Sequence, residues 1–229
     1  WGVTETLKRA SGMFALAVWD RELRELTLAR DRLGEKPLYY GWQGNGADAV
    51  FLFGSDLATL RRHPAFAAQV NRQALALYLR FNAIGGEYSI YEGIHKLLPG
   101  QALTVSLAKR TPHVNVYWSV AEVARIGADQ PFAGTDQEAV EHLGTELLRA
   151  VGQQMVSDVP LGAFLSGGID SSTVVALMQA QSAQPVKTFT IGFREPGYDE
   201  AAHARLVAQH LGTHHTELYV APEEAQAVI

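Results

Sequence analysis

Residues 164–173 read Phe-Leu-Ser-Gly-Gly-Ile-Asp-Ser-Ser-Thr, and this stretch decides the fold of the second half of the chain. An apolar run, Leu161–Leu165, ends where the small residues begin, and a helix-like stretch, Thr173–Met178, follows them. This order predicts a strand, a tight bend and the N-terminus of a helix. Glycine and serine at such a bend are typical of phosphate-binding loops, so we expect the protein to bind a nucleotide.

Each residue type in the bend has a role in this interpretation. Gly167 and Gly168 let the backbone approach a phosphate closely. The following helix directs free N–H groups and a partial positive charge at the same place. The carboxylate of Asp170 would repel phosphate, so we expect it to ligate Mg²⁺, which bridges carboxylate and phosphate. The hydroxyl groups expected to donate to phosphate oxygens are those of Ser166, Ser171 and Ser172.

Simpler explanations and other phosphate motifs fit less well. A helix N-cap explains one serine or the aspartate, but not the whole cluster after an apolar strand. A Walker A loop counted from Gly162 would need lysine where Gly168 stands. The run Gly44–Ala49 matches a dinucleotide fingerprint, but strand-like Val50–Phe53 follows it instead of a helix, so it predicts a hairpin turn.

Composition places the chain among ordinary globular proteins. It has 229 residues, of which 47% are hydrophobic and 19% charged, and a net charge of −5. The negative charge disfavours a nucleic-acid partner, and no apolar run reaches the roughly 20 residues that span a bilayer. The chain has no cysteine and shows no secretory signal, so we expect a cytoplasmic protein without disulfides or a membrane partner.

The first half reads as short strands joined by turns, with two helices. The predicted strands are Phe14–Trp19, Leu26–Arg30, Leu38–Trp42, Val50–Gly54, Gln101–Leu107 and His113–Trp118, the last two forming a hairpin. A short helix is expected to end at Arg62, and a longer one to cover Arg72–Arg80. Residues 120–134 show no clear period and are interpreted as a linker.

The second half alternates helices and strands, which predicts a parallel sheet with helices on both faces. The predicted elements are the helix Thr135–Val156, the strand Leu161–Leu165, the helix Ser171–Gln181, the strand Val186–Phe193, the helix Glu200–Leu211 and the strand His215–Val220. The continuous apolar character of Leu161–Leu165 suggests a buried central strand. Ligands of such sheets bind at the carboxyl ends of strands, where Ser166 stands.

Four motifs resemble one known family. The bend Ser166–Ser172 is similar to the pyrophosphate loop of N-type ATP pyrophosphatases, and the whole pattern resembles glutamine-hydrolysing asparagine synthetases. The other motifs lie before and after the bend. They are residues 30–40, preceded by 12–15 and 19–20; residues 188–193, followed by 198–200; and residues 207–208 and 211–213, followed by His215 and Glu217.

The resemblance implies a fold class and domain boundaries. Residues 1–118 would be part of a class II glutamine amidotransferase domain, an α+β sandwich of the Ntn type. Residues 119–134 would be a linker. Residues 135–229 would be the N-terminal part of an α/β, Rossmann-like, parallel-sheet ATP pyrophosphatase domain. The resemblance places ATP on Leu165, Ser166, Gly167, Gly168, Asp170, Ser171 and Ser172, with Ile191 contacting adenine through its backbone and Asp170 holding the metal.

The resemblance also implies a reaction. A ligase of asparagine biosynthesis would adenylate the side-chain carboxylate of aspartate, release pyrophosphate and amidate the intermediate with ammonia from glutamine. It would use ATP and Mg²⁺, with aspartate and glutamine as further substrates, and it is compatible with a homodimer. Two alternatives stay open: a relative that amidates another carboxylate, on a surface polysaccharide or a peptide or in closing a β-lactam-type ring, and a non-catalytic nucleotide-binding scaffold.

The sequence departs from the family at its ends. The family's nucleophile is an amino-terminal cysteine, and this chain starts at Trp1 and has no cysteine. Ile229 falls within a helix-like stretch that opens at residues 222–224. We therefore expect a fragment of a longer protein, inactive by itself, and we assign no catalytic residue within it.

Three polar pairs or runs have competing interpretations. The charges of residues 30–36 could form a solvated hairpin or lie near a contact between the two domains. His214 and His215 would point to opposite faces of a strand, so joint metal ligation is not expected. Asp199 and Glu200 could be an acid–base pair, but helix capping explains them more simply.

Overall fold

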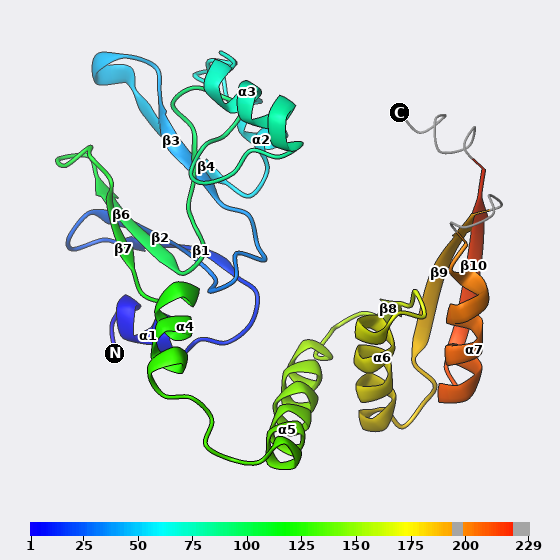
Figure 1. Ribbon diagram of the computed structural model, residues 1–229. Coiled ribbons are helices and arrows are strands. Elements are labelled where there is room, and N and C mark those ends of the chain that lie inside the picture. Colours follow the sequence, from blue (N-terminus) through cyan, green and yellow to red (C-terminus); the bar gives the residue numbers. More distant parts are fainter. Residues whose placement is uncertain (194–198, 222–229) are drawn as a thin grey trace. The chain divides into compact units, whose positions relative to one another are not determined.

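The computed structural model describes residues 1–193 and 199–221. These residues form two compact units, 1–131 and 132–229, which are described separately (Figure 1). The first unit contains α1 (Val3–Arg9), β1 (Ala15–Asp20), β2 (Glu25–Arg30), β3 (Tyr39–Gln43), the 3₁₀ helix η1 (Gly46–Asp48), β4 (Val50–Gly54), α2 (Leu57–Leu60), α3 (Arg72–Phe81), β5 (His95–Lys96), β6 (Gln101–Ser106), β7 (His113–Val116) and α4 (Val120–Asp129).

Two antiparallel sheets make the core of the first unit. Their strand orders are β1-β2-β6-β7 and β4-β3-β5, so the predicted hairpin of β6 and β7 is confirmed. Leu28 and Leu103 of one sheet pack with Tyr40 of the other in a single buried cluster. Leu7 of α1 packs against Ala29 of β2 in a second cluster, so strands and a helix share the core.

One turn and one helix cap in this unit follow the sequence pattern closely. The run Gly44–Ala49 joins β3 to β4 through η1, which confirms the predicted hairpin turn. Asn71 caps α3 by accepting hydrogen bonds from the backbone N–H groups of Gln73 and Ala74. These local signals were therefore sufficient to place the turn and the helix.

The charged run at residues 30–36 is not the solvated hairpin that was one of the two alternatives expected for it. Asp31 is only 1% exposed, and its carboxylate accepts hydrogen bonds from the N–H groups of Phe14, Glu35 and Lys36 at 3.3, 2.9 and 2.9 Å. The Arg30 guanidinium donates to the carbonyl oxygens of Lys36, Gly34 and Leu97. Charged side chains thus satisfy the backbone of an irregular segment inside the unit.

We expect Asp31→Asn to lower the free energy of unfolding by about 2 kcal/mol or more, because charge-assisted hydrogen bonds are lost. Burial opposes ionisation of Asp31, but the backbone donors outweigh it and lower the pKa below 3.8. The contribution is therefore present above the ordinary pKa and is lost as the pH falls through the lowered one. Urea unfolding at pH 7 and pH 3 should show a smaller difference from wild type at pH 3.

The control for this prediction is Asp20→Asn. The Asp20 carboxylate accepts from the N–H groups of Glu22 and Leu23, but it lies exposed at a turn. We expect a much smaller change for this variant. An equal loss of stability in both variants would contradict the role given to the buried carboxylate.

The expected linker contains a helix that was not predicted. Residues 120–129 form α4, capped by Ser119, whose hydroxyl accepts from the N–H of Glu122. Arg125 pairs with Glu122 and Asp129 at spacings of three and four residues, a spacing that stabilises isolated helices. The expectation of an aperiodic segment was wrong at this point, although the two units do divide within residues 119–134.

The second unit has the predicted alternation of helices and strands. Its elements are α5 (Asp136–Gln154), β8 (Gly162–Phe164), α6 (Ile169–Gln181), β9 (Lys187–Phe193), α7 (Ala201–Leu211) and β10 (His214–Val220). β8 and β10 both pair with β9 in parallel register, in the order β10-β9-β8. Thr135 and Glu138 form a capping box at the start of α5. The helix expected to open at residues 222–224 lies outside the described residues.

Two details of the predicted sheet were wrong for the part of the chain that the structure describes. β8 is an edge strand, and β9 is the central one, because β9 pairs with both neighbours. Helices cover one face of the sheet: Leu165, Val175 of α6 and Ala204 of α7 share a buried cluster (Figure 1). On the opposite face Phe164 and Ile191 are 77% and 47% exposed, so helices do not cover both faces here.

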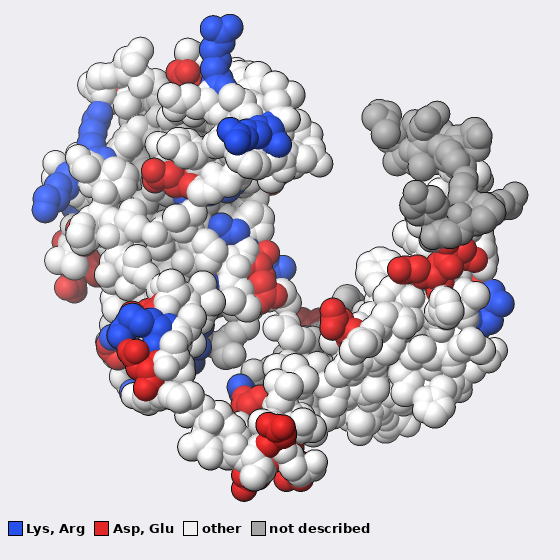
Figure 2. Space-filling view, in the orientation of Figure 1, with Lys and Arg blue, Asp and Glu red and all other residues white. Residues whose placement is uncertain are grey.

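The surface carries mixed charges. On the face shown in Figure 2, Lys and Arg are scattered among acidic residues and form no continuous basic area. Among the described residues no helix has the length and apolar character needed to cross a bilayer.

Candidate nucleotide-binding site

The bend between β8 and α6 is anchored to the central strand. Leu165 is 1% exposed, and its N–H donates to the carbonyl of Phe189 at 2.9 Å. The Thr190 hydroxyl donates to the Leu165 carbonyl. Residues 161–181 therefore form the predicted strand, bend and helix, with the bend at the carboxyl end of β8, where ligands of parallel sheets bind.

Two serines hold the bend in shape. The hydroxyl oxygens of Ser166 and Ser171 lie 2.9 Å apart, and the N–H of Ser166 donates to the Ser171 hydroxyl at 3.2 Å. The Gly168 N–H donates to the Ser166 hydroxyl at 3.3 Å. The structure thus brings Ser166, Gly168 and Ser171 together. A phosphate oxygen that accepted a hydrogen bond from one of these hydroxyl groups would bind to a preorganised site.

Gly167 shows why glycine is needed in the bend. Its φ of 79° lies in the left-handed region that side chains rarely adopt. A Cβ at this position would stand 2.8 Å from the Cβ of His203 and 2.9 Å from the backbone nitrogen of Ala204. The bend therefore lies directly against the first turn of α7, without a side chain between them.

Ser172 and Asp170 occupy different sides of the first turn of α6. The Ser172 hydroxyl oxygen is buried and has no hydrogen-bond partner among the described residues. It lines a groove between α6 and α7 together with Thr173 and Val207. Asp170 is exposed in the first turn. The structure does not show Ser172 hydrogen-bonded with the Ser166 and Ser171 pair.

The residues at the bend suit a phosphate. No side chain of the described residues caps α6, so the N–H groups of its first turn are open to an acceptor. The unsatisfied Ser172 hydroxyl is a further donor close to this turn. For Mg²⁺, Asp170 offers the hard oxygen ligand that this ion prefers. The described residues contain no group of three or more possible metal ligands, so phosphate oxygens and water would have to complete its shell.

Ile191 lies beside the bend on the central strand. Successive residues of a strand direct their N–H and C=O groups to alternate sides, and Phe189 directs its carbonyl toward β8. Ile191, two residues further, directs its backbone to the same side, beyond Phe164 where β8 ends. This orientation is compatible with the backbone contact to adenine that the resemblance implied.

The start of α7 lies at the same edge of the sheet as the bend. The Asp199 carboxylate accepts from the N–H of Ala201 at 3.0 Å, which agrees with the capping interpretation of this residue. Glu200 makes no such side-chain bond. The contact of His203 and Ala204 with the bend was not predicted from the sequence. No local signal marks it, because it arises when α7 packs back on the sheet.

The two adjacent histidines point as predicted. His214 is exposed, whereas the side chain of His215 is 10% exposed and its Nδ1 lies 2.9 Å from the Thr188 hydroxyl. Glu217, near His215, accepts hydrogen bonds from Nε and Nη2 of Arg205 at 2.6 and 2.5 Å. These groups join α7 to β10 by polar contacts on the covered face of the sheet.

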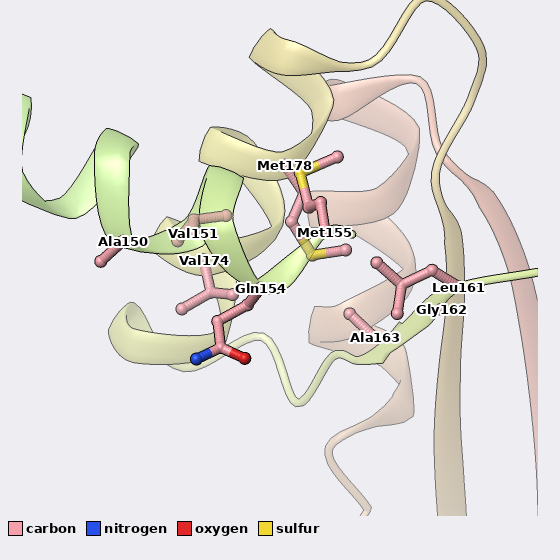
Figure 3. Close-up of a pocket in the computed structure, with 9 residues that line it drawn as sticks. All are labelled: Ala150, Val151, Gln154, Met155, Leu161, Gly162, Ala163, Val174 and Met178. Atoms are coloured by element: carbon pink, nitrogen blue, oxygen red, sulfur yellow. The ribbon is translucent and has the colours of Figure 1, made fainter. Parts of the chain in front are cut away.

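A separate hollow in this unit is unsuited to phosphate. It has a volume of about 410 Å³ and lies between α5, α6 and β8 (Figure 3). Figure 3 shows aliphatic and methionine side chains around it, such as Val151, Met155 and Met178, with the polar side chain of Gln154 among them. It lacks the donors that the bend supplies, so the bend remains the candidate site.

Comparison with known families divides the chain as the structure does. The sequence model of the glutamine amidotransferase domain matches residues 1–118. The sequence model of asparagine synthase matches residues 142–229, which include the bend and all three strands of the parallel sheet.

Curated relatives cover almost the whole chain. A Methanocaldococcus jannaschii protein, provisionally named glutamine-hydrolysing asparagine synthetase 2, is 34% identical over 98% of this chain and 42% of its own length. The glutamine-hydrolysing asparagine synthetase 3 of Bacillus subtilis is 33% identical over 81% of this chain and 29% of its own. A Penicillium rubens protein named amidase chyE is 30% identical over 88% and 30%.

This chain therefore spans less than half the length of these relatives. The two family matches lie in the same order as the two units of the structure, and they account for the motifs around residues 30–40 and 166–172. The chain belongs to the glutamine-hydrolysing asparagine synthetase family.

Proposed function

We propose that the intact protein makes an amide in an ATP-dependent reaction, with aspartate as the acceptor and glutamine as the source of ammonia. The observation that carries the proposal is the bend between β8 and α6, held by the Ser166–Ser171 pair and open at the uncapped N-terminus of α6. The family membership of both units supports it.

The first step would be adenylation of the carboxylate. A carboxylate oxygen attacks the α-phosphorus of ATP, the bond to the bridging oxygen breaks, and pyrophosphate leaves. The N–H groups of the bend and the hydroxyls of Ser166, Ser171 and Ser172 would stabilise the charge that grows on the leaving group. Rotation of the Ser172 side chain would bring its unsatisfied hydroxyl to the phosphate. Asp170 would hold Mg²⁺, which neutralises phosphate charge.

The second step would be amidation. The nitrogen of ammonia attacks the acyl carbon, AMP leaves, and the nitrogen loses a proton. The backbone of Ile191 would keep the adenine in place during both steps. The first unit would contribute to glutamine hydrolysis in the intact protein, and we assign no catalytic residue to it within this chain.

The test is isotope exchange between pyrophosphate and ATP in the full-length protein with aspartate present. We expect Asp170→Asn to slow exchange by at least the roughly 10–100-fold that follows loss of a metal's outer-shell partner. Asp170 is exposed, so the melting temperature should not change. The control is Asp158→Asn, an exposed carboxylate in the same unit, which should exchange normally. Unchanged exchange in Asp170→Asn would contradict the assigned role.

A second acceptor class stays an alternative proposal. The Penicillium protein is named an amidase, so the names of the relatives do not all point to asparagine. AMP release from a panel of carboxylates, measured with the full-length protein, separates the two functions. Release with aspartate alone supports the first proposal. Release with a peptide or polysaccharide carboxylate and not with aspartate replaces it.

A further inference from the structure

The first turn of α7 packs against the bend. Both the Cβ and the carbonyl carbon of His203 lie within 3 Å of where a Gly167 side chain would begin, at 2.8 and 2.9 Å. His203 therefore touches the phosphate-binding segment through its own backbone and Cβ.

The Cβ of His203 lies beside Gly167, so its side chain starts at the bend. Cα–Cβ bonds in an α-helix tilt toward its N-terminus, so a residue of the first turn covers the region in front of the helix. In α7 that region is the sheet edge where β8 ends and the bend begins. His203 is exposed, and within residues 1–193 and 199–221 no hydrogen bond uses its ring nitrogens.

The described residues of the bend, 166–172, include no positively charged side chain to bind a polyphosphate. The bend supplies neutral N–H and hydroxyl donors, and Asp170 adds a negative charge. Among the described residues of this unit, Arg205 is held by Glu217 and Arg149 by Glu146. Lys187 lies at the opposite, amino end of β9. Of the described side chains able to carry positive charge, His203 is the one that the structure places against the bend.

We infer that His203 binds the pyrophosphate group of ATP, donating a ring N–H to an oxygen of the departing phosphates. The inference rests on the proposed function and extends it, since it adds a residue from α7 to a site otherwise built from β8, α6 and β9. An imidazole donates an N–H in its neutral and in its protonated form. The contact therefore needs no change of protonation during the reaction.

The test is binding of magnesium pyrophosphate to the full-length protein, measured by titration calorimetry, together with the exchange assay. We expect His203→Ala to weaken binding roughly tenfold or more, because one strong hydrogen bond is lost. His203→Lys should regain part of the affinity. The KM for aspartate should not change in either variant. A merely structural role would not give this pattern, since lysine would not restore it.

The matched control is His214→Ala, an exposed histidine at the amino end of β10. It should bind pyrophosphate as wild type does. Equal affinity of His203→Ala and wild type overturns the inference while leaving the proposed function in place if wild-type exchange occurs. If the wild-type protein shows no exchange, the proposed function fails. If His203→Ala still weakens pyrophosphate binding in that case, the His203 contact stands.

Discussion

Gly100→Ala should strongly destabilise the first unit. Gly100 has a φ of 68°, and a Cβ there would stand 2.1 Å from the carbonyl oxygen of Trp118. The left-handed conformation costs a residue with a side chain roughly 1–2 kcal/mol. The overlap with backbone adds about 1–3 kcal/mol, because the chain must move. The sum, about 2–5 kcal/mol, is a large part of the roughly 5–15 kcal/mol that stabilises a typical protein.

The overlap also breaks a junction of hydrogen bonds. The carbonyl of Gly100 accepts from the N–H groups of Tyr117 and Trp118 at 2.9 and 3.2 Å, and its own N–H donates to the carbonyl of Asp31. A shift of Trp118 would disturb these bonds together. The end of β7 and the start of β6 would then separate.

Tryptophan fluorescence measures this effect directly, because all four tryptophans of the chain lie in residues 1–131. The midpoint of urea unfolding should fall sharply in Gly100→Ala. Gly127→Ala is the control: this glycine is exposed within α4 and nothing stands within 4 Å of its Cβ position. That variant should be neutral or slightly more stable, since alanine favours helices. Equal midpoints for the two variants would refute the steric argument.

The sequence predicted most elements because their signals are local. The capping box at Thr135, the cap at Asn71 and the apolar run before Ser166 each fix an element within a few residues. α4 was missed although its signals are present in the sequence: Ser119 is a suitable cap, and Val120, Val123 and Ile126 recur at helical spacing. These apolar side chains are exposed in the structure, so no buried core accompanies the pattern.

The position of β8 could not be derived in the same way. An apolar run predicts burial but does not name the strands that will pair with it, and strand order depends on contacts distant in sequence. Asp31 shows the same limit. Its sequence context is charged and looks solvated, yet three backbone N–H groups from two segments meet at its carboxylate.

The candidate site was predicted in part. The bend could be read from residues 166–172, since glycine, serine and a following helix are contiguous there. The contact with α7 could not, because residues 167 and 203 are brought together by the packing of two helices on one face of the sheet. Residues of a site that are contiguous in the chain can be predicted from the sequence, whereas contacts from a distant element follow from the fold.

Gly167→Ala should abolish exchange between pyrophosphate and ATP, with a loss of at least about 100-fold, as when one donor of a preorganised anion site is removed. The new Cβ would overlap the Cβ of His203 and the backbone nitrogen of Ala204, at 2.8 and 2.9 Å. The φ of 79° adds strain that alanine tolerates poorly. The bend must then move away from α7 or change its conformation, and either response displaces the Ser166 and Gly168 donors.

Gly168→Ala is the control. It shows whether the expected loss of exchange is specific to Gly167 or follows from replacing any glycine of the bend. Gly168 has a φ of −71°, which alanine adopts freely, and its Cβ would meet only the Ser166 hydroxyl, at 3.3 Å. We expect this variant to keep its fold and to lose less activity than Gly167→Ala. Hydrogen exchange of residues 162–181, followed by mass spectrometry, should show faster exchange in Gly167→Ala alone. If Gly167→Ala kept wild-type pyrophosphate exchange, a bend packed tightly against α7 could not be the phosphate site.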